Sequence, residues 1–157
     1  MQVEAILLLR DRLANSLAFA IALALAANVS AGNQIDPALA GLYFGEASAL
    51  CERDAGSLWG VSLCGPMLFA DPKDHAVVAN QQLADGGFSA IEKTFTGTLP
   101  SIINVANSAV DWGGAKWTML MWPLPKDARQ RAILLMHESW HRIQSSRVRP
   151  GHRLGSF

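Results

Sequence analysis

Charged side chains are scarce in this chain. Asp, Glu, Lys and Arg make up 17% of its 157 residues, against roughly 25% in a typical soluble domain. The 13 acidic and 13 basic residues also cancel to a formal net charge of zero. A chain without a basic excess lacks the electrostatic field that attracts phosphate backbones, so we expect no nucleic-acid partner. Half of the residues are hydrophobic, and this length suits one globular domain.

Charge is missing altogether from residues 13–31, where residues 16–27 form an almost unbroken apolar run. Arg10 and Arg12 precede this run, and the small residues Val29-Ser30-Ala31 follow it. A positive start, a short apolar core and a small-residue exit are typical of a secretory signal peptide.

We therefore predict that residues 1–31 are a signal peptide and that residues 32–157 are an exported domain, periplasmic or secreted. Two alternatives stay open. The segment could remain as an uncleaved membrane anchor, because residues 5–9 add apolar length, or it could be a buried helix of the folded domain. We expect contact with a membrane only through this segment, if it stays uncleaved.

The shortage of charge persists in residues 32–157, which keep 11 of the 13 residues of each sign. A domain this small exposes most of its surface, so a low content of charge predicts that part of the surface is covered. The cover could be a partner, a membrane or missing chain.

Cysteine is also rare, with Cys51 and Cys64 as the two examples. Their spacing is not the CxxC of a redox or zinc pair. In an exported protein the two could form a disulfide, whereas two buried thiols would satisfy the sequence equally well.

The hydrophobic pattern predicts a single α+β domain with antiparallel strands in the middle and a helix near the end. The expected elements are a helix at residues 37–54, strand-like runs at 56–69 and 75–78 around a turn at 71–74, short strands near Phe88 and Phe95, a turn at 111–114 and a strand at 117–122. Pro66 would be confined to a sheet edge or a bulge.

The last helix begins after Asp127, which can cap it, with Gln130 three residues on as in a capping box. Its apolar residues recur at helical spacing, and we predict that they form its core face: Ile133, Met136, Trp140 and Ile143.

On the neighbouring stripe of this helix lie His137 and His141, with Glu138 directly after the first histidine. This is the HExxH pattern. The spacing of four residues places two imidazoles side by side, as two corners of a zinc tetrahedron require. The glutamate can then take a proton from a water in the same cleft.

Residues 117–144 resemble the active-site helix and preceding strand of the zincin metallopeptidases. In that family an edge strand pairs with an extended peptide above the zinc, and the HExxH helix lies beneath. The resemblance implies that His137 and His141 bind Zn²⁺, that Glu138 is the catalytic general base, and that the substrate is a peptide or protein.

The chain departs from the family at the third zinc ligand. Metzincins place a third histidine six residues after the second, where this chain has Arg147. Gluzincins and aspzincins use a downstream Glu or Asp, but residues 142–157 contain neither. His152 is the one residue in that segment of a type that can bind zinc. We therefore expect residues 32–157 to be an incomplete, gluzincin-like N-terminal catalytic subdomain whose tail from Ser145 onward adds no core.

Two functions follow from the sequence. The first is a zinc-dependent peptidase. The second is a small exported binding or structural domain in which the HExxH pattern is fortuitous or inactive.

The predicted signal peptide gives a direct test. We expect mass spectrometry of the exported protein to find Gly32 as its first residue, because Val29-Ser30-Ala31 ends the signal. A soluble cytoplasmic protein that retains Met1 would contradict export.

Overall fold

The computed structural model describes residues 34–147, and the side chains of residues 34–144. The predicted signal peptide at residues 1–31 and the candidate ligand His152 lie outside this range. The described elements follow one another as α2 (Pro37–Asp54), β1 (Met67–Ala70), β2 (Ala76–Ala79), β3 (Ser89–Ile91), β4 (Thr94–Thr98), β5 (Ser108–Trp112), β6 (Ala115–Met121) and α3 (Ala128–Arg147). The predicted α+β class is confirmed. Neither described helix is long and apolar enough to cross a bilayer.

The strands form one six-stranded sheet in the order β3-β4-β2-β1-β6-β5. All neighbouring pairs are antiparallel except β1 and β6, which run parallel. The expected antiparallel pairing therefore holds for four of the five strand pairs, and the sheet as a whole is mixed. The pattern of each strand predicts its conformation but not its partner, and β6 returns across the sheet to pair with a strand far earlier in the chain.

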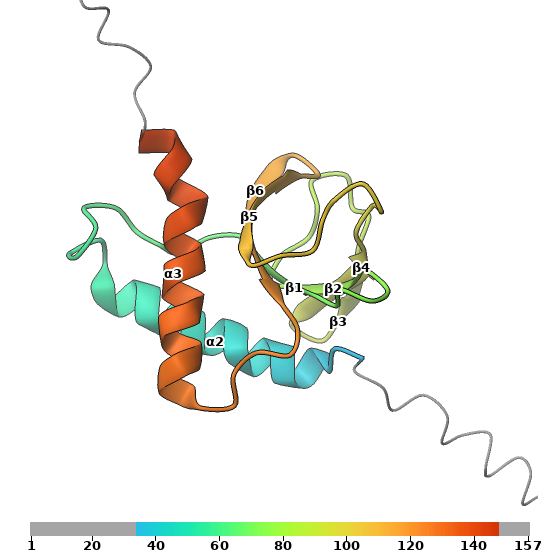
Figure 1. Ribbon diagram of the computed structural model, residues 1–157, viewed down its shortest axis with the longest axis horizontal. Helices are drawn as coiled ribbons and strands as arrows, with labels where there is room; N and C mark the ends of the chain where they lie inside the picture. The colour runs from blue at the N-terminus through green and yellow to red at the C-terminus, as the bar shows by residue number, and fades with distance from the viewer. Residues whose placement is uncertain (1–33, 148–157) are drawn as a thin grey trace, which may run out of the picture. The chain divides into compact units, whose positions relative to one another are not determined.

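Both helices lie on one side of the curled sheet and cross each other there (Figure 1). Phe44 of α2 stacks on Phe69 of β1 with ring centroids 4.4 Å apart, and Leu135 of α3 joins the same buried cluster. A second cluster around Trp117 and Met119 fills the opposite face of the sheet. Because β1 and β2 are covered on both faces, they are nearly continuous apolar runs rather than alternating ones.

The helix predicted at residues 37–54 is confirmed with the same bounds. Asp36 caps it by accepting a hydrogen bond from the backbone N–H of Ala38 at 2.9 Å, and Pro37 occupies the first turn, where a missing N–H costs nothing. The helix ends at Ala55, whose left-handed φ of 46° closes the last turn.

The predicted hairpin around residues 71–74 is also confirmed, but its first strand is shorter than expected. Residues 56–66 form a loop, because Gly56 and Gly60 take positive φ values of 80° and 69° that end any strand there. Pro66 directly precedes the central strand β1 instead of lying at an edge or bulge. Its carbonyl accepts a hydrogen bond from Thr118 N–H at 2.9 Å, and its missing N–H is tolerated at a strand start.

The face of α3 that packs on the sheet differs from the predicted one. Ile133 is 62% exposed, and Met136, Trp140 and Ile143 are only partly buried. The buried residues of the helix are Arg131, Leu135, Glu138 and Ser139. A mostly polar stripe therefore faces inward, and the physical reason lies with Arg131.

Arg131 is 6% exposed and its guanidinium is hydrogen-bonded on three nitrogens. Nε and Nη2 donate to the two carboxylate oxygens of Glu46 on α2 at 2.7 and 2.8 Å. Nη1 donates to the carbonyls of Pro125 and Lys126 at 2.8 and 3.0 Å, and the cation lies 4.2 Å from the centroid of the Tyr43 ring. The hydrogen bond with Glu46 raises the pKa of Arg131 above its ordinary value. This cluster joins α2, α3 and the segment between β6 and α3.

Cys51 and Cys64 form a disulfide with their Cα atoms 5.3 Å apart, so the alternative of two buried thiols is excluded. The bond ties the last turn of α2 to the segment that enters β1.

Replacing Arg131 should destabilise the domain. We expect Arg131→Met to lower the free energy of unfolding by about 2–3 kcal/mol, because two backbone carbonyls and a carboxylate lose their donor. The partly exposed Glu46 regains water, which limits the loss. Urea denaturation followed by circular dichroism measures it. The exposed Arg129→Met on the same helix is the matched control, and equal effects of the two substitutions would contradict the assigned role.

The disulfide gives a second expectation. Closing a loop of this length is worth about 3 kcal/mol, so the double variant Cys51→Ser, Cys64→Ser should unfold at a lower temperature by several degrees. A reductant should lower the midpoint of the wild-type protein to that of the variant. No change with reductant would show that the bond contributes nothing to stability.

Candidate metal centre

The two histidines of the HExxH pattern converge on the exposed side of α3. His137 and His141 lie one helical turn apart, and their Nε2 atoms are 3.0 Å from each other. The ring planes are nearly perpendicular, at 82°, with centroids 4.6 Å apart. Both side chains are exposed, so the pair is open to solvent. The structure therefore brings together the two predicted ligands.

Gln144 orients the second histidine and was not singled out from the sequence. Its Oε1 lies 3.0 Å from His141 Nδ1. Because an amide oxygen only accepts, this contact places the proton of neutral His141 on Nδ1 and leaves the lone pair on Nε2. Gln144 follows His141 by three residues, and this helical spacing is the signal that could have identified it.

Glu138 lies on the inner side of the same turn and is 5% exposed. Its Oε2 atom is buried and has no hydrogen-bond partner among the described residues. A buried carboxylate oxygen without a partner is costly, and such groups in folded proteins call for a proton, a water or a ligand. Glu138 thus follows His137 directly in sequence but is buried on the inner side of the helix, and its Oε2 is uncommitted among the described residues.

The separation of the two Nε2 atoms is close to that of two nitrogens bound to one tetrahedral zinc ion. Two nitrogens bound to one tetrahedral Zn²⁺ lie about 3.3 Å apart, since each Zn–N bond is roughly 2.0–2.1 Å long. The observed separation of 3.0 Å requires only a small movement of one ring. Within residues 34–147 no group of three His, Cys, Asp or Glu side chains is placed to hold a metal. The described residues therefore bring together two imidazoles, the number of zinc ligands that the sequence predicts on this helix.

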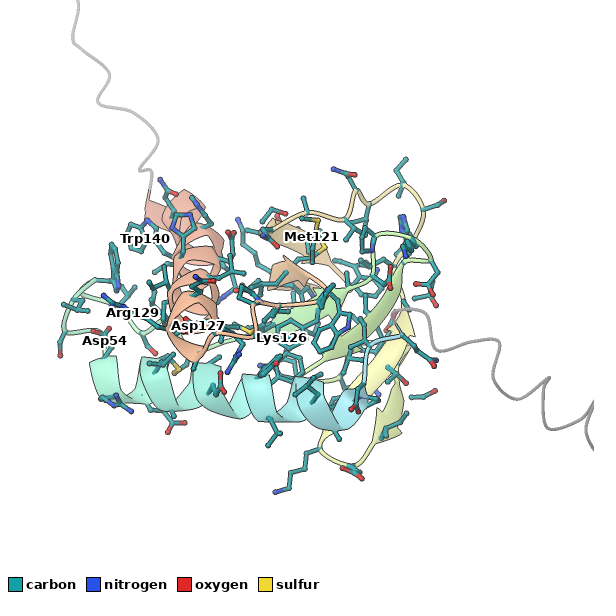
Figure 2. The ribbon with its side chains drawn as sticks, turned by 60° about the horizontal axis from the view of Figure 1, so that its bottom comes forward. Asp54, Met121, Lys126, Asp127, Arg129 and Trp140 are labelled. Carbon is teal, nitrogen blue, oxygen red and sulfur yellow. A yellow bond between two sulfur atoms is a disulfide. The ribbon has the colours of Figure 1, made fainter. Side chains whose placement is uncertain are left out.

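Two tryptophans stack on each other along the helix that carries the histidine pair. Trp140, which precedes His141, stacks on Trp59 of the loop at residues 56–66 with ring centroids 4.4 Å apart. Trp140 lies on the flank of α3 turned away from Met121 and the sheet (Figure 2). The loop that replaces the predicted first half of a strand therefore packs against the helix of the candidate site.

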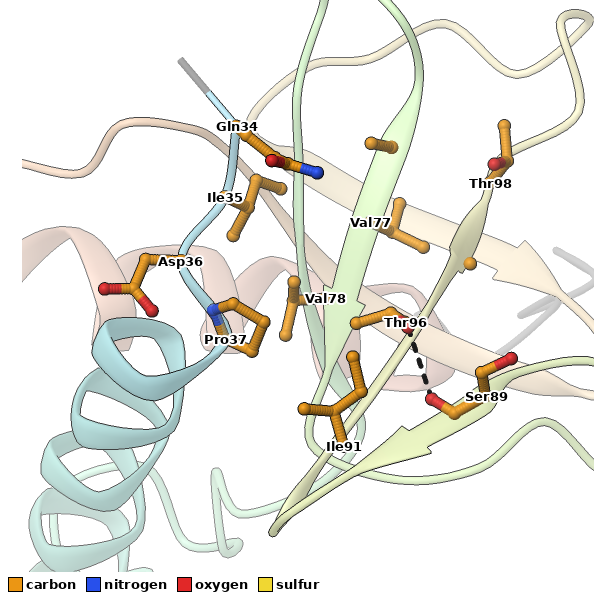
Figure 3. A pocket seen from close by; sticks show the side chains of 12 residues that line it. Gln34, Ile35, Asp36, Pro37, Val77, Val78, Ser89, Ile91, Thr96 and Thr98 are labelled. Carbon is orange, nitrogen blue, oxygen red and sulfur yellow. Dashed lines mark hydrogen bonds between the residues drawn. The ribbon is translucent and has the colours of Figure 1, made fainter. Parts of the chain in front are cut away.

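One of the surface hollows lies away from the histidine pair. It has a volume of about 560 Å³ and opens between the start of α2 and strands β2, β3 and β4 (Figure 3). Its apolar walls include Ile35, Val78 and Ile91, and its one carboxylate, that of Asp36, caps α2. No residue of α3 lines it, so it does not extend the histidine site.

Comparison with known proteins adds no assignment to this geometry: no family model, no curated protein and no solved structure matches the chain.

Proposed function

We propose that the chain is an exported, zinc-dependent peptidase that hydrolyses peptide bonds in peptide or protein substrates. His137 and His141 are the two zinc ligands that the described residues provide, and Glu138 is the general base. The observation that carries the proposal is the pair of Nε2 atoms 3.0 Å apart, on a helical turn where the residue after His137 has a buried carboxylate oxygen without a hydrogen-bond partner among the described residues.

In this proposal the two histidines hold the metal, and Glu138 transfers the proton. Zinc in such a site supplies Lewis-acid polarisation and lowers the pKa of a bound water. His141 presents its Nε2 lone pair because Gln144 accepts the proton on Nδ1. Glu138 has no competing hydrogen bond on Oε2, so this oxygen is available to accept a proton and later return it to the leaving amine.

The sheet offers a place for an extended substrate. The strand that directly precedes α3 is β6, which is internal, whereas β5 is the edge strand beside it. Helix α3 packs against both strands. An edge strand presents unpaired backbone groups that an extended peptide can join. This arrangement supports a peptide substrate bound along β5, above the helix.

Export is supported by the disulfide. Structural disulfides persist in oxidising compartments and are rare in the cytosol. The Cys51–Cys64 bond therefore agrees with the signal peptide predicted at residues 1–31.

A second candidate function is a small exported binding or structural domain that uses no metal. It is favoured by one observation: within residues 34–147 the histidine pair has no third metal-ligating side chain beside it. The contact between the two Nε2 atoms would then be a plain hydrogen bond between the rings.

Zinc stoichiometry distinguishes the two functions. We expect the protein to bind one Zn²⁺ per chain, more weakly than a site with three protein ligands would, and His137→Ala to bind it more than about 100-fold more weakly still, since even a lost outer-shell partner costs 10–100-fold. Elemental analysis and competition with a chromophoric chelator measure this. His75→Asn is the control, because it removes an imidazole outside α3 and Asn tolerates the positive φ of 60° there. Equal zinc content in both variants would favour the second function.

Activity tests the base. We expect Glu138→Gln to keep the zinc and to slow cleavage of a fluorescence-quenched peptide mixture by about 10²–10⁴-fold, because the amide cannot accept the proton. Because Gln has nearly the same shape as Glu, we expect the variant to fold like the wild type. A variant that lost zinc and kept its activity would reverse the assignment of roles.

A further inference from the structure

Arg142 follows His141 on α3 and lies one helical turn after Glu138. Its half-buried guanidinium donates from Nε to Thr118 Oγ1 at 3.2 Å. Nη2 donates to the carbonyls of Leu63 and Cys64, each at 2.9 Å. Among the described residues no carboxylate forms an ion pair with it. The guanidinium therefore donates its hydrogen bonds to neutral oxygens, one on the sheet and two on the segment before β1.

Both ends of this contact are firmly held. Thr118 is buried in β6, where it pairs with Met67 at the start of the parallel pairing with β1. Cys64 is bonded through its sulfur to Cys51 of α2, so the carbonyl that Arg142 binds belongs to a tethered residue. The guanidinium links α3 to two elements that cannot easily move.

Gly65 makes room for this arrangement. A Cβ atom on Gly65 would lie 2.6 Å from Cζ, Nη1 and Nη2 of Arg142, far inside van der Waals contact. The backbone of Gly65 does not take a positive φ, so the absence of a side chain here serves the guanidinium rather than the turn.

The clamp acts on the part of α3 that carries the site. Leu135 and Ser139 are buried on the same side of the helix, and Arg142 extends this anchoring by one more turn. His141 and Gln144 lie around that turn. The last turns of a helix fray unless they are held, and a frayed turn would lose the contacts of His141 with Gln144 and with His137.

We propose that Arg142 is a positioning residue of the histidine site. By clamping the C-terminal part of α3 to Thr118 and to the carbonyls of residues 63 and 64, it holds His141 in register with His137 and Glu138. The proposal rests on the proposed function only for the identity of the ligand, Zn²⁺.

Four variants of the full chain test it: Arg142→Met, Arg142→Lys, Gly65→Ala and the control Arg129→Met, an exposed arginine on the same helix. Gly65→Ala changes nothing on α3 and displaces only the end of a flexible side chain, so it tests the clamp even if Arg142→Met folds poorly. The measurements are the imidazole ¹⁵N–¹H signals of His137 and His141 without metal, the dissociation constant for Zn²⁺ alone, and the thermal midpoint.

We expect Arg142→Met and Gly65→Ala to shift the imidazole signals of His141 and to weaken Zn²⁺ binding about 10-fold, the scale at which outer-shell residues act on metal sites. Arg142→Lys should recover part of the affinity, because an ammonium can bind the two carbonyls but not Thr118 at the same time. Arg129→Met should match the wild type in all three measurements.

Two results separate failure of this inference from failure of the proposed function. A lower thermal midpoint with unchanged imidazole signals and unchanged Zn²⁺ affinity would show that Arg142 only stabilises the fold and would overturn the inference. If the wild-type protein binds no Zn²⁺ through His137 and His141, the proposed function fails instead. The imidazole signals of the metal-free proteins then decide the role of Arg142 by themselves.

Discussion

The burial of one cation, Arg131, determines how α3 presents its residues. A guanidinium removed from water needs acceptors for its donors, and here Glu46, Pro125 and Lys126 supply them from α2 and from the segment before α3. These acceptors lie in fixed directions, so they set the rotation of α3 about its own axis. Because Arg131 faces inward, the stripe with His137 and His141 faces outward.

The sequence predicts the elements whose signals are local. The N-cap, proline and apolar spacing of residues 36–54 are sufficient for α2, and the turn at residues 71–74 is sufficient for the β1–β2 hairpin. HExxH spacing alone places two imidazoles together, because a helix fixes the geometry of residues four apart.

The features that sequence reasoning missed depend on residues distant in the chain. The apolar stripe of α3 suggested its core face, but the partner of Arg131 lies 85 residues earlier, on α2. The parallel pairing of β1 with β6 has no local signal either. Residues 56–66 contain apolar runs like those of a strand, yet they form a loop whose Trp59 stacks on Trp140 of α3. In each case a tertiary contact outweighs the local pattern.

The inward stripe of α3 contains three ionisable residues, and the contrast among them isolates the candidate site. Arg131 is neutralised by a carboxylate, and Arg142 is surrounded by carbonyls and a hydroxyl. Glu138 differs, because its Oε2 has no hydrogen-bond partner within the described residues. A fold that satisfies the two cations of this stripe and leaves the buried carboxylate oxygen without a partner among the described residues retains free energy that a proton or ligand can recover.

The pairing of β1 with β6 also has a consequence for the order of folding. Strand β1 is an interior strand, and its partner residues on one of its two neighbours come 51 residues later. The disulfide and the β1–β2 hairpin join residues close in sequence and can form early, whereas the sheet stays open until β6 arrives. During synthesis from the N-terminus, the nascent chain therefore exposes the apolar flank of β1 until the last third of the protein has emerged. Its greatest hazard is aggregation at that intermediate stage, before α3 covers the sheet.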